Sequence, residues 1–77
     1  MQIFLDIGKL KERARMSGIP LKALCGKAGV NSSTPSRIAR TGRSHTKTMI
    51  DLSRALHVLE REQLERLRAT LEADHAA

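Results

Sequence analysis

Aromatic residues are almost missing from this chain, whose 77 residues include one phenylalanine, Phe4, and neither tryptophan nor tyrosine. Proteins that hold single-stranded nucleic acid usually stack its bases on aromatic rings, so this scarcity argues against a single-stranded ligand. Cysteine is equally scarce. Cys25 is alone and cannot form an internal disulfide, which fits a reducing, cytoplasmic setting. We expect it to pack as a small buried apolar residue.

Other features are also lacking. No apolar run reaches the roughly 18 residues of a membrane-spanning helix, and residues 1–6 lack the basic start and cleavage site of a signal peptide. The three histidines, His45, His57 and His75, are isolated and have no second cysteine near them, so the ligand spacing of a zinc site is missing. Neither a phosphate-binding glycine loop nor a catalytic triad is indicated. We therefore expect a protein that is not an enzyme and holds no metal or cofactor.

Positive charge, in contrast, is plentiful and unevenly placed. Residues 1–58 carry eleven Lys/Arg and three Asp/Glu, a difference of +8, whereas residues 59–77 carry three and five, a difference of −2. The total is +6. Such an asymmetry is typical of a protein that binds a polyanion, although a merely soluble basic protein would have the same totals. Without an aromatic platform, duplex DNA is the polyanion that fits best.

The spacing of apolar residues predicts an all-α chain with five helices, at about residues 7–16, 20–28, 32 or 34–40, 46–57 and 60–73. Proline inside a helix costs about 3 kcal/mol because it lacks an N–H. Pro35 therefore predicts that the third helix begins late, with Ser33 or Thr34 as its cap. We expect residues 1–77 to form one domain, with a four-helix core at 7–58 and a fifth helix and tail at 59–77.

The second and third predicted helices are short and meet at a turn that begins with Gly29. Two such helices cannot lie antiparallel along their length, so they should cross steeply and leave the second one projecting. One face of that helix carries hydroxyl and guanidinium groups and no acid, from Ser33, Ser36, Arg37 and Arg40. A helix fits the DNA major groove, where arginine pairs with guanine and hydroxyls contact several base edges.

At this point the chain resembles the lambda-repressor-like helix-turn-helix DNA-binding family, over roughly residues 7–58. The resemblance rests on the ordered segments LKERARMSGI at 10–19, LCGKAGV at 24–30, SRI at 36–38 and TMIDLSRAL at 48–56. It implies a compact five-helix domain whose third helix reads the major groove. It also implies a homodimer on a pseudo-palindromic operator and a transcriptional regulator, most simply a repressor, of phage or bacterial type.

The resemblance also implies roles for individual side chains, by position in this chain. Those at or beside base-contacting positions are Ser32, Ser33, Ser36 and Arg37. Those in regions that contact phosphate are Lys22, Arg40 and Arg43. Asn31 and Thr34 are interpreted either as helix caps or as further phosphate contacts. Because base contacts specify sequence and phosphate contacts set position, we expect Arg37 to be the main specificity residue.

Four positions depart from the family pattern. Pro20 and Leu21 stand where the family often has Ser or Thr followed by Gln, so a glutamine that bridges to phosphate is missing. Ala39 stands where a glutamate is common, and Pro35 replaces an aliphatic residue. The late helix start that Pro35 predicts would also change how Ser32 and Ser33 are presented to DNA.

Leucines 64, 67 and 71 form an apolar stripe on the predicted fifth helix. Either this stripe closes the monomer core, or it is a homodimer interface that places two recognition helices about one DNA turn, roughly 34 Å, apart. An alternative function is an antitoxin-type module. In that case the helix-turn-helix serves autoregulation, and the last helix or residues 72–77 bind a partner protein.

Overall fold

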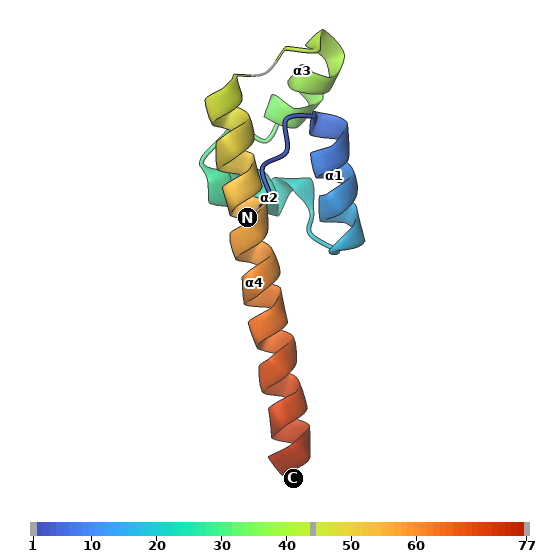
Figure 1. Ribbon diagram of the computed structural model, residues 1–77, viewed down its shortest axis with the longest axis vertical. Coiled ribbons are helices and arrows are strands. Elements are labelled where there is room, and N and C mark those ends of the chain that lie inside the picture. The colour runs from blue at the N-terminus through green and yellow to red at the C-terminus, as the bar shows by residue number, and fades with distance from the viewer. Residues whose placement is uncertain (1, 44, 77) are drawn as a thin grey trace.

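The computed structural model describes residues 2–43 and 45–76, and all regular structure within those ranges is helical (Figure 1). Four helices follow one another: α1 (Ile7–Met16), α2 (Leu21–Ala28), α3 (Thr34–Thr41) and α4 (Thr46–Ala76). The prediction of an all-α chain is confirmed. None of these helices is long and apolar enough to cross a membrane within the described residues.

Helix α1 has the limits that its sequence predicts. The Asp6 side chain accepts a hydrogen bond of 2.7 Å from the Gly8 N–H and so caps the first turn. At the other end the chain turns through Gly18 at φ 71°, and the Ile19 N–H donates to the Ala14 carbonyl at 2.8 Å. This turn brings Ile19 back against the core, where it is buried.

Helices α2 and α3 are separated by five residues, 29–33. Gly29 ends α2 at φ 75°, a left-handed conformation in which glycine has no Cβ to strain. The Val30 N–H then donates to the Cys25 carbonyl at 3.0 Å. Regular helix resumes at Thr34, with Ser33 at the cap position and Pro35 in the first turn. The predicted late start is thus confirmed, and Pro35 lies where its missing N–H has no helical partner.

The prediction of five helices is wrong, because the expected fourth and fifth helices are one continuous helix, α4, of 31 residues. The last glycine of the chain is Gly42 and the last proline is Pro35, so no helix-ending residue lies within α4. The half-buried side chains of Leu59 and Glu60 continue its packing through the expected break. The expected division of the domain at residue 58 therefore falls inside a helix.

The core lies between the first half of α4 and the three short helices. Its fully buried large side chains come from each element, and include Leu10, Leu24, Pro35, Met49, Leu52 and Leu56. Cys25 is also buried, at 1% exposure, as expected of a small apolar residue. We call α1, α2, α3 and the first half of α4 the body of the molecule. The second half of α4 projects beyond this body and gives the molecule its 52 × 21 × 20 Å extents (Figure 1).

The leucine stripe lies on the projecting half of α4. Leu64, Leu67 and Leu71 are 63%, 56% and 60% exposed. They therefore do not close the core of this chain, and that interpretation is wrong. The last points at which the body is tied to α4 are two ion pairs, Arg13 with Glu60 at 3.0 Å and Lys27 with Glu62 at 3.1 Å.

Gly26, inside α2, and Gly29, which follows its last residue, give opposite predictions. Replacing Gly29 by alanine puts a side chain into the left-handed region, so Gly29→Ala should lower the free energy of unfolding by about 1 kcal/mol. Gly26 lies in the helix interior with ordinary dihedrals and open space around it. Gly26→Ala should therefore raise stability by about 0.5–1 kcal/mol. Urea unfolding followed by circular dichroism measures both, and equal effects would contradict the assignment of the turn.

Candidate nucleic-acid interface

Helix α3 has one buried and one exposed face. Thr34, Pro35 and Ile38 are buried on its inner side, which packs against α1. The side chains expected to face outward, Ser33, Ser36, Arg37 and Arg40, are all exposed. Pro35 and Ile38 thus hold α3 against the core. Because apolar burial fixes the roll of the helix, the hydroxyl and guanidinium groups are displayed together on the surface.

Asn31 organises the turn that leads into α3. Its Oδ1 atom accepts hydrogen bonds from the Ser33 N–H at 2.9 Å and from the Ser33 hydroxyl at 2.8 Å. Its carbonyl accepts from the Thr34 N–H at 3.0 Å. This geometry supports the capping interpretation of Asn31. The Ser33 hydroxyl donates its proton here but keeps oxygen lone pairs that can accept a further bond. Ser32 is exposed in the same turn.

Thr34 requires a correction. Only 7% of its surface is exposed, because it is the first residue of α3 and its side chain turns toward the body. A buried hydroxyl cannot reach a phosphate group outside the protein, so the interpretation of Thr34 as a phosphate contact does not fit this structure. Thr34 belongs to the inner face of α3.

The four basic side chains predicted to contact DNA are exposed, and none of them forms an ion pair within the part of the chain that the structure describes. Arg37 and Arg40 lie on α3, Arg43 follows Gly42 in the loop to α4, and Lys22 lies in the first turn of α2. Both ion pairs recorded among the described residues lie elsewhere, at Glu60 and Glu62. Opposite the projecting end of α4, α3 and the start of α4 share one end of the molecule (Figure 1).

Lys47 was not predicted as part of this surface. It is exposed in the first turn of α4, immediately after the loop that carries Arg43. A signal for it exists in the sequence: residues 13–50 contain eight Lys/Arg (13, 15, 22, 27, 37, 40, 43 and 47) and no Asp or Glu. Such an acid-free run keeps one sign of charge over every element it forms, here from the end of α1 to the start of α4.

Acidic residues are concentrated at the other end of the molecule. Glu60 and Glu62 neutralise Arg13 and Lys27, which lie on the sides of α1 and α2 that face α4. The cations around α3 have no such partners among the described residues. A surface of uniform positive sign attracts a polyanion over a distance of about one Debye length, roughly 8–10 Å. Cys25 is outside this surface, and burial raises the pKa of its thiol, which disfavours the reactive thiolate.

No family model matches the chain, and neither a curated protein nor a solved structure matches it. Function therefore has to be inferred from the geometry around α3 and from the resemblance of the motifs.

Substitutions can test whether the Asn31 side chain stabilises the turn before α3, with the neighbouring Ser32 as a control. Asn31→Ala removes the acceptor of two hydrogen bonds, so it should lower the free energy of unfolding by about 1 kcal/mol. For a chain of this size that corresponds to a fall of about 4–8 °C in Tm. Ser32→Ala is the matched control, because this exposed side chain makes no recorded hydrogen bond among the described residues. An unchanged Tm for Asn31→Ala would show that this side chain does not hold the turn.

Proposed function

We propose that this protein is a sequence-specific, double-stranded DNA-binding regulator of transcription in which α2, residues 29–33 and α3 form a helix-turn-helix. One observation carries the proposal. The outer face of α3 displays Ser33, Ser36, Arg37 and Arg40 without an acid, while its inner face is anchored in the core. A helix held in this way presents its polar side chains to the major groove without having to rearrange.

The residues around α3 divide into two groups by their position. Arg37 and Ser36 lie in the middle of the exposed face, where base edges would be met, and Ser32 and Ser33 lie at its start. The other exposed cations would contact phosphates: Arg40 and Arg43 lie at the end of α3 and in the following loop, and Lys22 and Lys47 lie in the first turns of α2 and α4. Asn31 acts mainly through the turn. Base contacts then provide sequence preference, whereas the surrounding cations provide affinity that falls with salt.

The protein would act without chemistry, as a repressor that occludes a promoter. A homodimer would read a pseudo-palindromic operator, because a two-fold protein presents the same helix to two half-sites. The exposed leucine stripe at 64, 67 and 71 supports such a dimer, since a row of exposed leucines is a typical interaction surface. Only α3 and its surroundings would touch the operator.

A second function, an antitoxin-type module, is favoured by the same projecting half of α4. An exposed leucine stripe can be covered by a different protein as well as by a second copy. In that case the helix-turn-helix would serve autoregulation and α4 would hold the partner protein. Co-purification of a second protein in a one-to-one ratio would favour this function over the repressor.

Two arginine variants test the DNA-binding proposal. Arg37→Ala should weaken specific binding by about 1–3 kcal/mol and flatten the preference for specific over scrambled duplex. Arg40→Ala should weaken binding to both duplexes by a similar factor, because a phosphate contact does not distinguish sequences. The measurement is fluorescence anisotropy with DNA from upstream of the protein's own gene and scrambled competitor, at two salt concentrations.

Arg15→Ala is the matched control. Arg15 is an exposed arginine in the last turn of α1, away from α3, so its loss changes net charge by the same unit. It should change either affinity less than about twofold, because salt weakens the effect of a charge that does not contact the DNA. If Arg37→Ala behaved like Arg15→Ala, the assignment of α3 as the recognition helix would be wrong.

A further inference from the structure

The leucine stripe continues the face of α4 that is buried in the core. At 100° per residue, the buried Met49, Leu52 and Leu56 and the exposed leucines 64, 67 and 71 all fall within an arc of about 120°. The body covers this face only as far as the ion pairs at Glu60 and Glu62. Beyond these two ion pairs the same apolar face of α4 is exposed.

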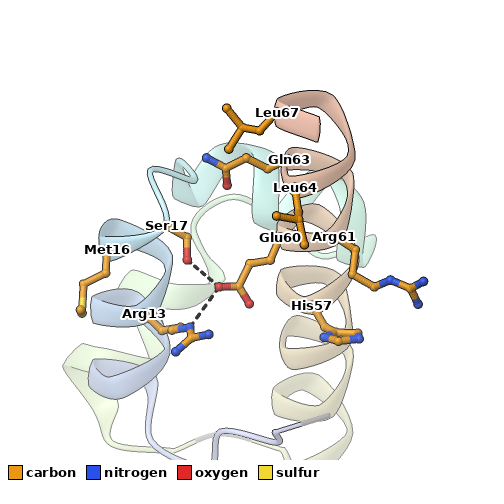
Figure 2. A pocket seen from close by; sticks show the side chains of 9 residues that line it. All are labelled: Arg13, Met16, Ser17, His57, Glu60, Arg61, Gln63, Leu64 and Leu67. Carbon is orange, nitrogen blue, oxygen red and sulfur yellow. Dashed lines mark hydrogen bonds and ion pairs between the residues drawn. The ribbon is translucent and has the colours of Figure 1, made fainter. Parts of the chain in front are cut away.

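A groove opens where the body stops. It has a volume of about 480 Å³ and lies between the end of α1 and α4 (Figure 2). Met16 forms one side, where it is 77% exposed, and Leu64 and Leu67 form the other. Its floor is Glu60, whose Oε2 accepts hydrogen bonds from the Arg13 Nε–H and the Ser17 hydroxyl.

We infer that a second copy of this chain covers the stripe, with its α4 antiparallel to the first and with the end of its helix in this groove. The spacing of the leucines is nearly symmetric about residue 67, three residues on one side and four on the other. A two-fold axis there sets Leu67 against Leu67 of the partner subunit. By the same symmetry, Leu64 of each subunit faces Leu71 of the other subunit.

A parallel pair of α4 helices is sterically excluded by the body of the molecule. Because the stripe and the buried core residues share one face of α4, a parallel partner helix would run along that face into α1 and α2. An antiparallel partner meets no such obstacle. Its helix ends beside the groove, and its own body lies beyond the projecting end of the first α4. Each helix then covers the apolar surface that the other body leaves open, as a two-fold interface requires.

Charge complementarity favours the same direction. One flank of the stripe carries Arg61 and Arg68 together with Glu65 and Glu72, and the other flank carries Gln63, Arg66 and Thr70. In an antiparallel pair like flanks meet, so Glu72 of the partner subunit comes beside Arg61, and Glu65 of the partner subunit beside Arg68. In a parallel pair the two arginines would instead face the flank of Gln63, Arg66 and Thr70, none of which is an acid.

The antiparallel arrangement sets the distance between the two ends of the dimer that carry α3. That these ends bind DNA rests on the proposed function. From Thr46 to Leu67 is 21 residues of α4, or about 32 Å at 1.5 Å per residue. The two starts of α4, and with them the two α3 helices, would be about 63 Å apart. That is close to two turns of B-DNA, at about 34 Å each, in place of the single turn expected from the sequence.

Cysteine cross-linking tests the direction of the pair, in a Cys25→Ala background. Under oxidising conditions, Leu64→Cys alone and Leu71→Cys alone should give little disulfide dimer, whereas a refolded mixture of the two should give abundant dimer. Disulfides need Cα atoms within about 7 Å, and only the antiparallel pair sets 64 against 71. Abundant dimer from each single variant would show a parallel pair and overturn the inference.

Ala69→Cys is the matched control, because residue 69 lies on the opposite face of α4 and should not cross-link. Leu67→Glu gives an independent measurement. Leu67 is 56% exposed in the monomer, so the helical circular dichroism should persist while light scattering shows the mass falling from dimer to monomer. A monomeric wild-type chain, or a stripe occupied by a different co-purifying protein, would overturn the inference.

No DNA enters these experiments, so their failure and that of the proposed function are distinguishable. A cross-linked antiparallel dimer without DNA binding would leave the inference standing and remove the function. If DNA binds, footprinting should find half-sites with centres about 20 base pairs apart. Half-sites about 10 base pairs apart would contradict the antiparallel arrangement even if the chain is dimeric.

Discussion

Burial of the first half of α4 against α2 and α1, with α3 packed on α1, is the interaction on which the rest of this structure depends. Met49, Leu52 and Leu56 are the side chains through which α4 reaches the core, and each is almost fully buried. The short helices, of 8 to 10 residues, would be marginal alone, since isolated helices shorter than about 12–15 residues rarely persist in water. Their orientation, including the roll of α3, therefore follows from how each packs against the others and α4.

The roll of α3 links this core to the candidate interface. Pro35 and Ile38 occupy the inner side of the helix, so Arg37 and Arg40 are left on the outer side. A change that loosened the inner side would disturb the outer face without touching it. The guanidinium groups also have no acidic partner among the described residues, so binding a phosphate or a base edge would break no ion pair recorded in this structure. Both properties favour a surface that is prepared for a polyanion.

Much of this could be predicted from the sequence, because glycine, proline and capping side chains mark helix ends through local chemistry. Gly29 ended α2 where it was expected to, and Pro35 correctly predicted the start of α3. Two features could not be predicted in this way. The continuity of α4 depends on the absence of a helix-ending residue and on packing at Leu59 and Glu60, which a pattern of leucines does not report. The burial of Thr34 depends on the position of α1, which lies outside its local sequence.

The continuity of α4 changes what the leucine stripe can do. A separate fifth helix could have folded back and buried its leucines on the monomer, and a compact dimer would then have kept its two α3 helices close. Because α4 is one continuous helix that extends beyond the body, its apolar face continues away from the core instead. Since Leu67 lies about 32 Å along α4 from its start, any partner that covers the stripe is held at the end of the molecule opposite to α3. The same helix thus holds the leucine stripe and the exposed face of α3 at opposite ends of the molecule, and the length of α4 sets the distance between them.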